Sequence, residues 1–363
     1  MKGLILSGGA GTRLRPITHT SAKQLVPIAN KPILFYGIES MAAAGITNIG
    51  IVVGDTRDEI KAAVGDGGRF GVRVTYIPQD APLGLAHCVR IARDFLGEDD
   101  FVMYLGDNML EQGLGQFVER FAAERDGSLW AHAPAVAQIL LKEVPNPTAF
   151  GVAEVDDHDR VVRLVEKPQD PPSNLALVGV YLFTRRIHDA VAAIAPSPRG
   201  ELEITDAIQW LIDQGERVRH EVLKGWWIDT GKKDPLLECN RMVLDTLEAK
   251  VSGDVDADSI VEGRVVIEVG AALINSRVRG PAIIGSGSRV VNSYIGPYSS
   301  IASGCEIIDS DLEHSVVLER SRIIGVVRLT DSLIGRDVEV QRSLTRPAAT
   351  RMMLGDDSRV ELE

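Results

Sequence analysis

The 363-residue chain has few cysteines, few aromatic residues and no long apolar segment. Its three cysteines, Cys88, Cys239 and Cys305, lie far apart and lack the close spacing of metal ligands. We interpret them as reduced thiols, as is typical of cytoplasmic proteins. No apolar run approaches the roughly 18 to 20 residues of a membrane span, and the first apolar stretch is too short for a signal peptide. The sequence therefore predicts a cytoplasmic protein with no membrane partner.

Acidic residues are missing from one stretch of the chain. The first 38 residues contain no Asp or Glu, although the whole chain has a formal net charge of -12 at pH 7. A small basic region in an acidic chain favours a phosphorylated small molecule over nucleic acid, because nucleic acid needs a broad positive face. The cations of this stretch are Lys2, Arg13, Arg15, Lys23 and Lys31.

A glycine-rich loop lies within this stretch. An apolar strand at residues 3–7 runs into Gly8-Gly-Ala-Gly-Thr-Arg-Leu14. Glycines let backbone N–H groups approach phosphate oxygens. The loop lacks the third glycine of a dinucleotide fingerprint and the Gly-Lys-Ser/Thr ending of a P-loop. It suits a triphosphate attacked at its α-phosphorus, with Arg13 stabilising the leaving pyrophosphate; the alternative is an ordinary solvated turn.

The first two thirds of the chain predict an α/β fold. Strand-like and helix-like segments alternate up to about residue 125, which favours a Rossmann-like, mainly parallel sheet covered by helices. A hairpin and a further strand follow, and then two amphipathic helices. The expected strands are 3–7, 48–53, 72–77, 101–105, 150–155, 160–165 and 174–183, and the expected helices are 32–45, 57–64, 85–96, 202–213 and 236–247.

The C-terminal third has a different periodicity. Ile284, Val290, Ile295, Ile301 and Ile307 follow one another at spacings of six, five, six and six residues. Such near-hexad spacing predicts a left-handed parallel β-helix, with a β-meander as the alternative. We therefore expect a catalytic domain at 1–248, a polar linker at 249–259, a hexapeptide-repeat-like β-helix at 260–350 and a tail at 351–363.

Two acids are candidate metal ligands. Asp107 follows the strand expected at 101–105, and Asp229 follows an apolar cluster and precedes Gly231. Ligands of open α/β sheets bind at the carboxyl ends of the strands. Two carboxylates converging on triphosphate oxygens would bind Mg²⁺. Taken singly, an Asp at such a position is more often a turn or cap residue than a metal ligand.

Two further pairs could contact substrate. Glu166 and Lys167 are adjacent on a strand and therefore point to opposite faces, unless the strand ends irregularly before Pro168. In that case Glu166 could accept bonds from sugar hydroxyls, and Lys167 could pair with a sugar phosphate. Gln24 and Gln79 carry amides that can pair with a pyrimidine base, although isolated glutamines are usually surface residues.

Together these motifs resemble the sugar-1-phosphate nucleotidylyltransferases, and in particular the glucose-1-phosphate thymidylyltransferase branch that carries a C-terminal extension. The resemblance covers residues 1–248. Besides the glycine-rich loop it rests on Lys23-Gln24, Gln79, Gly84-Leu-Ala86, Leu105-Gly-Asp-Asn108, Phe150-Gly151, Glu166-Lys-Pro168, Pro198-Arg-Gly-Glu-Leu-Glu-Ile-Thr-Asp206 and Trp227-Ile-Asp-Thr-Gly231.

The resemblance implies a role for each matching position. Arg13, Lys23, Asp107 and Asp229 would be catalytic, and the two aspartates would hold Mg²⁺. The residues implied for the nucleotide are Gly8, Gly11, Thr12, Arg13, Lys23, Gln24, Gln79, Gly84 and Asp107, with Gln24, Gln79 and Gly84 at the thymine. Those implied for the sugar phosphate are Asn108, Gly151, Glu166, Lys167 and Val178. Phe150 departs from the tyrosine that members often have there.

The implied reaction joins dTTP and glucose-1-phosphate into dTDP-glucose and pyrophosphate. The ionised sugar phosphate is itself the nucleophile, so no covalent enzyme intermediate is needed. The alternatives are a UTP-using or other sugar-1-phosphate nucleotidylyltransferase, a bifunctional enzyme whose β-helix transfers acetyl groups, and a non-catalytic regulatory subunit that binds sugar nucleotides. Stacked coils can present flat faces to other subunits, so we expect a homo-oligomer.

Overall fold

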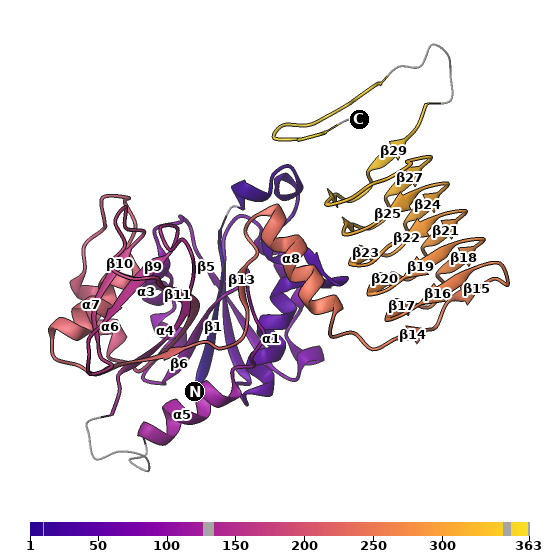
Figure 1. The fold of residues 1–363 in the computed structure, drawn as a ribbon. Coiled ribbons are helices and arrows are strands. Elements are labelled where there is room, and N and C mark those ends of the chain that lie inside the picture. Colours follow the sequence, from indigo (N-terminus) through magenta and orange to yellow (C-terminus); the bar gives the residue numbers. More distant parts are fainter. Residues whose placement is uncertain (10, 126–133, 344–349, 362–363) are drawn as a thin grey trace. The chain divides into compact units, whose positions relative to one another are not determined.

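The computed structural model describes residues 1–9, 11–125, 134–343 and 350–361, and backbone contacts divide the chain into two units (Figure 1). The first unit comprises Met1–Ala10 and Ile33–Trp227, and the second comprises Gly11–Pro32 and Ile228–Glu363. The glycine-rich loop is therefore shared between the units. Gly8 belongs to the first unit, whereas Gly11 and the residues that follow it belong to the second.

The first unit is built on a nine-stranded mixed sheet, as the α/β pattern predicts. The main strand order is β10-β9-β11-β6-β1-β4-β5, with β8 joined to β11 and β12 joined to β8. The neighbours β6, β1, β4 and β5 are parallel, and β11 runs antiparallel to β6. The strands are β1 Lys2–Ser7, β4 Asn48–Val53, β5 Arg73–Pro78, β6 Phe101–Leu105, β8 Ala137–Glu143, β9 Gly151–Val155, β10 Val161–Glu166, β11 Leu175–Phe183 and β12 Val218–Val222, and a short strand β7 Asn108–Leu110 follows β6.

Helices cover both faces of this sheet. Leu4 and Leu6 of β1 join a buried cluster with residues of α3, α6 and α7. On the other face, a Cβ on Gly3 would lie 2.5 Å from Sδ of Met41 in α1. Because both faces of β1 are buried, its sequence is a continuous apolar run. The helices are α1 Ile33–Ala43, α2 Arg57–Val64, α3 Leu85–Ile91, α4 Arg93–Leu96, α5 Gly115–Arg125, α6 Ile187–Ala193 and α7 Ile204–Asp213.

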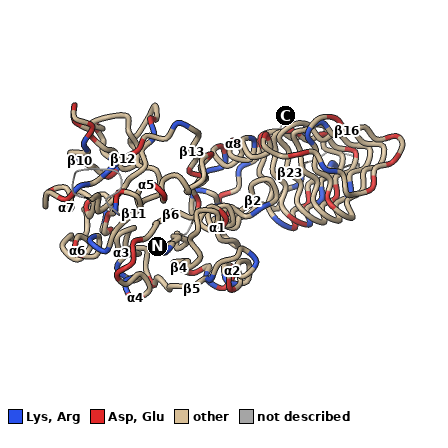
Figure 2. The backbone as a smooth tube through the Cα atoms, turned by 90° about the horizontal axis from the view of Figure 1, so that it is seen from below, with Lys and Arg blue, Asp and Glu red and all other residues tan. Residues whose placement is uncertain are grey.

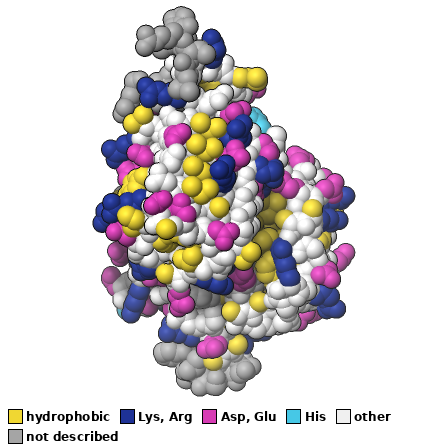
Figure 3. All heavy atoms as spheres, turned by 90° about the vertical axis from the view of Figure 1, so that its right-hand side faces the viewer, with side chains coloured by type: hydrophobic (Ala, Val, Ile, Leu, Met, Phe, Trp, Pro, Cys, Tyr) yellow, Lys and Arg dark blue, Asp and Glu magenta, His cyan; other side chains and the backbone are white. Residues whose placement is uncertain are grey.

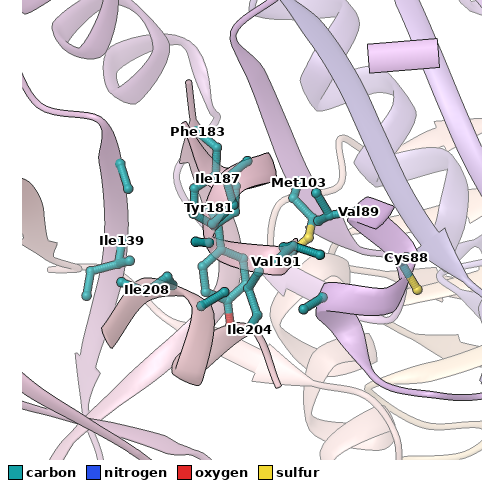
Figure 4. Close-up of a cluster of buried hydrophobic side chains, with 14 of the residues drawn as sticks. Cys88, Val89, Met103, Ile139, Tyr181, Phe183, Ile187, Val191, Ile204 and Ile208 are labelled. Carbon is teal, nitrogen blue, oxygen red and sulfur yellow. The ribbon is translucent and has the colours of Figure 1, made fainter. Parts of the chain in front are cut away.

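One expected helix is wrong in its extent. The helix predicted over 85–96 is two helices, α3 and α4, because Ala92 between them has φ −85° and ψ 2°. The core beneath these helices is continuous all the same. Figure 4 shows Val89 of α3 beside Met103 of β6, with Phe183 and Ile187 close by. This packing fixes the carboxyl ends of β1 and β6, where candidate site residues follow.

The C-terminal region of the second unit is a parallel β-helix of three sheets. Ile284 is in register with Ile301, and Val290 with Ile307. Each of these steps is 17 residues, so spacings of six, five and six residues carry the chain once around the three faces. The aliphatic residues that set the predicted spacing are all buried in one core, and the strand pairs of these sheets are parallel, which excludes the β-meander.

The three sheets of the β-helix contain six, six and four strands. The first sheet contains β14 Lys250–Val251, β17 Val265–Ile267, β20 Ala282–Ile284, β23 Ser299–Ile301, β26 Val316–Val317 and β28 Leu333–Ile334. The second contains β15 Asp254–Val255, β18 Ala272–Ile274, β21 Arg289–Val291, β24 Glu306–Ile308, β27 Arg322–Ile324 and β29 Glu339–Gln341. The third contains β16 Ile260–Glu262, β19 Arg277–Arg279, β22 Tyr294–Ile295 and β25 Asp311–Leu312.

The predicted linker at 249–259 contains strands of the first coil. β14 and β15 both lie within it and pair with β17 and β18. The polar composition comes from the corner of the coil between these two strands. Glycine is needed at this corner, because a Cβ on Gly253 would lie 2.4 Å from the carbonyl oxygen of Ala271. Corner residues therefore obscure the periodicity here. The expected partition at residue 248 into a catalytic domain and an extension stays a prediction.

Two smaller elements complete the second unit. Helix α8 spans Lys233–Leu244, and the hairpin strands β2 Pro27–Ile28 and β3 Lys31–Pro32 lie in the N-terminal segment. Leu244 of α8 packs with Ala29 of the hairpin and Ile283 of the β-helix in one buried cluster. Within the described residues, no helix has the length and apolar character needed to cross a membrane. All three cysteines are buried thiols without a disulfide.

Candidate active site

In the second unit, the glycine-rich loop folds tightly around Gly11. Gly11 has φ +64°, and a Cβ there would lie 3.0 Å from Cβ of Lys23 and 3.1 Å from Cγ2 of Thr18. Thr18 Oγ1 donates a hydrogen bond of 2.7 Å to the carbonyl oxygen of Gly11. A short 3-10 helix, Thr12–Leu14, begins immediately after it. Glycine is therefore required for the loop to bring Lys23 against the turn that precedes Thr12 and Arg13.

The side chains of this loop differ in exposure. Arg13 is exposed and makes no ion pair with any described residue, whereas Lys23 is half-buried. Gln24 is only 1% exposed, and its Oε1 atom has no hydrogen-bond partner in the described structure. A buried amide oxygen without a partner costs about 1–3 kcal/mol. That cost is relieved when a ligand donates to the oxygen, so Gln24 suits the donor edge of a base.

In the first unit, Gly8 and Gln79 lie together at the ends of β1 and β5. A Cβ on Gly8 would lie 2.4 Å from Oε1 of Gln79, so glycine makes room for the amide. Gln79 Nε2 lies 3.2 Å from Sγ of Cys88, to which it donates, and 3.3 Å from Nδ1 of His87. Burial raises the pKa of Cys88 to about 12 and lowers the pKa of His87. Gln79 is therefore held by uncharged neighbours.

A cavity of about 340 Å³ opens beside Gln79. It lies at the carboxyl ends of β4 and β5, and Asp55, Asp58 and Asp80 are among its lining residues. This volume is within the range of small-molecule sites. The lining also includes one cation, Arg57, so carboxylates still outnumber cations. This lining opposes a phosphate group and is compatible with an uncharged base or sugar.

Gly84 has a structural reason to be glycine. Its φ is +102°, and a Cβ would lie 2.4 Å from the carbonyl oxygen of Leu202. The two chain segments are joined there by backbone hydrogen bonds from Leu202 N to Leu83 O and from Ala86 N to Leu202 O. Gly84 therefore lets the start of α3 cross the segment before α7, and its contact with a base stays a prediction.

Asp107 follows β6, and the next residue orients it. Asn108 Nδ2 donates to Oδ1 of Asp107 at 3.1 Å, and Asn108 Oδ1 accepts from Nε1 of Trp227 at 2.6 Å. A Cβ on Gly179 would lie 2.7 Å from that Asn108 oxygen. Asn108 is 3% exposed, so in this structure it acts on Asp107 rather than at an open surface.

Trp227 is held in turn by an aromatic contact that sequence reasoning missed. The rings of Phe150 and Trp227 meet edge to face, with their centroids 5.1 Å apart. The departure from tyrosine at position 150 therefore still leaves a ring that positions Trp227. The only signal in the sequence was that both residues lie in motifs of the family.

Glu166 and Lys167 form a second group in the first unit. Lys167 has φ +43°, so the strand ends irregularly, as the sequence requires if both side chains are to reach one ligand. Lys167 Nζ lies 3.3 Å from Oε1 of Glu166, and Thr205 Oγ1 donates to Glu166 Oε2 at 3.4 Å. A Cβ on Gly151 would lie 2.7 Å from Cγ2 of Thr205 and 3.1 Å from Glu166 Oε2. Gly151 therefore clears the space around this carboxylate.

Arg199 joins this group, although the sequence analysis assigned no role to it. Its guanidinium contacts Glu166 at 3.4 Å and Glu203 at 3.1 Å. Burial raises the pKa of Glu203 and of Asp206, and the nearby charge of Glu166 raises both further. The group thus combines carboxylate acceptors with two cations. That combination can bind the hydroxyls and the phosphate of one sugar phosphate.

Two expected site residues, Val178 and Asp229, are not seen in contact with the groups described above. Val178 is completely buried in β11, at a shift in the register with β8. Asp229 Oδ1 accepts from the backbone N–H of Gly231 at 3.0 Å. Asp107 and Asp229 belong to different units, so their convergence on one metal stays a prediction. Within the described residues, no cluster of three or more His, Cys, Asp or Glu side chains could hold a metal ion.

Comparisons with known proteins fit this fold and these groups. The nucleotidyl transferase family model matches residues 2–246, and the chain belongs to this family. It is therefore a nucleotidyltransferase with a parallel β-helix attached.

The relatives narrow this class. A glucose-1-phosphate thymidylyltransferase of Streptomyces griseus is 58% identical over 362 residues, covering 100% of this chain and 99% of the relative. One of Streptomyces antibioticus is 56% identical and is covered completely. A crystal structure from Bacillus anthracis, assigned to a glucose-1-phosphate thymidylyltransferase, has 33% identity and a TM-score of 0.62, and the match covers 69% of this chain and 98% of that one.

Proposed function

We propose that this enzyme transfers a thymidylyl group from dTTP to glucose-1-phosphate, giving dTDP-glucose and pyrophosphate. The observation that carries the proposal is the 58% identity to a glucose-1-phosphate thymidylyltransferase along the entire chain. The glycine-rich loop with Arg13, the buried Gln24 amide and the Glu166 group support it, because they offer sites for a triphosphate, a base and a sugar phosphate.

The chemistry is an in-line displacement at the α-phosphorus. A phosphate oxygen of glucose-1-phosphate forms the new P–O bond, and the bond to the β-phosphate oxygen breaks, so pyrophosphate leaves with the electron pair. The attacking oxygen is already ionised at pH 7, so no strong base is needed. Arg13 and Lys23 would neutralise the charge on the leaving group, which is where electrostatic stabilisation contributes most. Lys167 and Arg199 would hold the attacking phosphate.

Mg²⁺ is the cofactor of this proposal. Asp107 and Asp229 supply carboxylate oxygens, the ligands that Mg²⁺ prefers, and Asn108 fixes the orientation of Asp107. When bound, the ion would offset triphosphate charge. We also propose that the enzyme works in the cytoplasm, as its three buried thiols favour, and as a homo-oligomer.

The choice of dTTP is tested by a nucleotide panel. Pyrophosphate release is measured with glucose-1-phosphate and either dTTP or UTP, at equal Mg²⁺. We expect kcat/KM for dTTP to exceed that for UTP at least tenfold. An equal or higher value with UTP would replace the thymidylyl assignment with a uridylyl one, and no turnover with either nucleotide would favour a regulatory subunit.

The β-helix offers no support for a second, acetyl-transferring activity. His314 is the only histidine of that region in the sequence. Its Nδ1 atom is paired with Asp331, and its ring meets Tyr298 edge to face at 6.2 Å. Both contacts hold the histidine within the coils, so we assign it a structural role.

A further inference from the structure

The second sheet of the β-helix (β15-β18-β21-β24-β27-β29) carries two ordered rows of side chains on its outer face. The central residue of each three-residue strand points into the β-helix core, as the complete burial of Val290 and Ile307 shows. The residues on either side of it therefore both point outward. Because successive strands pair in parallel and in register, each outward position forms a straight row along the coils.

The first row is aliphatic. It consists of Ile274, Val291, Ile308 and Ile324, each in register with the next, and it ends at Gln341. Ile274 is 36% exposed and the other three are half-buried. Figure 3 shows hydrophobic side chains gathered along the stacked coils on this side, with charged side chains beside them. Contiguous apolar surface of this kind marks an interaction site more often than isolated exposed residues do.

The second row is charged and alternates in sign. Its members are Arg289, Glu306, Arg322 and Glu339, again in register from strand to strand. Arg322 lies between two carboxylates, 2.8 Å from Glu306 and 3.1 Å from Glu339. Figure 2 shows basic and acidic residues interspersed along the outer edges of the coils in the same way.

This order of charges is self-complementary under one symmetry. A two-fold axis that lies in the face, parallel to the strands, reverses the order of the coils and keeps each row opposite its own copy. If the axis passes between β24 and β27, Arg289 meets Glu339 of the partner subunit and Glu306 meets Arg322 of the partner subunit. All four charges then face opposite charges, and Ile308 meets Ile324 of the partner subunit.

Other arrangements lose this match. A shift by one coil places Glu306 against Glu306 of the partner subunit, and Arg289 against Arg322 of the partner subunit. A two-fold axis along the coils keeps their order but moves the charged rows to opposite sides of the aliphatic row. The pattern therefore specifies both direction and register, as an isologous interface requires.

We propose that the outer face of this sheet binds the same face of a second copy of the chain, with the two β-helices antiparallel. Val291, Ile308 and Ile324 are removed from water between the subunits, and the charged rows select the register. The enzyme consequently assembles in an even number of chains. This interface is independent of which nucleotide the enzyme uses.

The test compares the masses of two charge variants with that of the wild-type protein by sedimentation velocity across a range of micromolar concentrations. Glu306→Arg creates two like-charged pairs across the axis, and we expect the dissociation constant of the pair to rise on the order of a hundredfold. The double variant Glu306→Arg with Arg322→Glu keeps opposite charges across the same axis, so it should restore the wild-type mass. A parallel arrangement gives no such rescue.

Two further variants complete the experiment. Ile308→Glu should also separate the subunits, because it places a charge in the aliphatic row. Glu262→Arg breaks the exposed ion pair with Arg277 on the third sheet and should leave the mass unchanged. Thermal melting of each variant shows that the β-helix is folded. A wild-type mass of one or three chains would overturn the proposal, as would folded Glu306→Arg at wild-type mass or a double variant that stays dissociated.

Discussion

Asn240 is expected to determine whether the N-terminal segment stays attached to the β-helix. The hairpin of β2 and β3 turns at Ala29 and Asn30, which both have positive φ, 47° and 61°. That turn type favours Asn and Gly, so alanine at its first position is strained by about 1–2 kcal/mol. Lys23 and Gln24 lie immediately before this hairpin, so the turn fixes where their segment ends.

Two amides hold the strained turn: Asn30 Nδ2 donates to the carbonyl oxygen of Ile301 at 2.7 Å, and the buried amide of Asn240 binds Ala29. Asn240 Oδ1 accepts one hydrogen bond from the backbone N–H of Ala29 at 2.9 Å and another from the hydroxyl of Ser300 at 2.8 Å. Asn240 Nδ2 donates to the carbonyl oxygen of Tyr298 at 3.2 Å. Asn240 is completely buried. Asn240→Ala leaves these three groups without their partner, at about 1–3 kcal/mol each. Because water can enter the space vacated by the amide, we expect a total loss of about 3–5 kcal/mol.

The assay is urea unfolding combined with hydrogen exchange. The free energy of unfolding should fall by the stated amount, and exchange should accelerate in the hairpin between Pro27 and Pro32. The matched control is Asn275→Ala, whose exposed side-chain amide donates to Asn292 at 2.9 Å. Loss of that hydrogen bond should lower the free energy of unfolding by about 1 kcal/mol. If Asn240→Ala costs no more than the control, or if exchange in the hairpin is unchanged, the amide does not hold the turn.

Three further outcomes are expected. Arg13→Ala should lower kcat on the order of a hundredfold with the fold intact, and near-normal turnover would remove its assigned role. Gly84→Ala should cost more than 2 kcal/mol of unfolding free energy, because its Cβ would lie 2.4 Å from the Leu202 carbonyl at φ +102°; a melting temperature within 2 °C of wild type would contradict this. Burial and the charge of Arg93 lower the pKa of His188 in the folded protein below its ordinary value of 6.5. At a pH between the folded pKa and 6.5, the unfolded chain therefore binds more protons at His188 than the folded chain does. Stability should therefore fall as pH drops below 6.5, and His188→Gln should flatten that slope in urea titrations.

The sequence predicted those parts of the fold that depend on local pattern. The alternation of strands and helices predicts a sheet covered by helices, and the structure covers β1 on both faces. The spacing of Ile284, Val290 and Ile295 indicates three faces per coil, and the three sheets confirm it. Both patterns are local: the apolar run that marks β1 in the alternation follows from burial of a strand on both faces, and the near-hexad spacing follows from one inward-facing residue on each face of a coil.

Contacts between distant residues could not be predicted in this way. Gly84 was assigned to a base, yet its conformation is imposed by Leu202, which lies more than a hundred residues away. The resemblance implies a contact of Asn108 with the sugar phosphate, and the structure adds that its amide binds Asp107 and Trp227. Nothing in the local sequence around position 108 shows where Trp227 lies. Residue type and motif order therefore predict which residues form the site, whereas the contacts that hold Gly84 and Asn108 in place are seen only in the structure. Their contacts with substrate stay predictions.

The acid-free N-terminal stretch is another case in which contacts with distant residues could not be predicted from the local sequence. Lys2 donates to the carbonyl of Phe95 at 2.6 Å and pairs with Asp99 at 2.9 Å, which lowers the pKa of that carboxyl. Arg15 faces Asp357 at 3.8 Å. Both cations are therefore partly neutralised by acids from elsewhere in the chain.

Arg13 is exposed and forms no ion pair within the described residues. A cation that the fold leaves unpaired can bind an anionic ligand without first breaking an ion pair. The absence of local acids does not by itself show which cation binds an anion, because distant acids pair with Lys2 and Arg15 but, among the described residues, none pairs with Arg13.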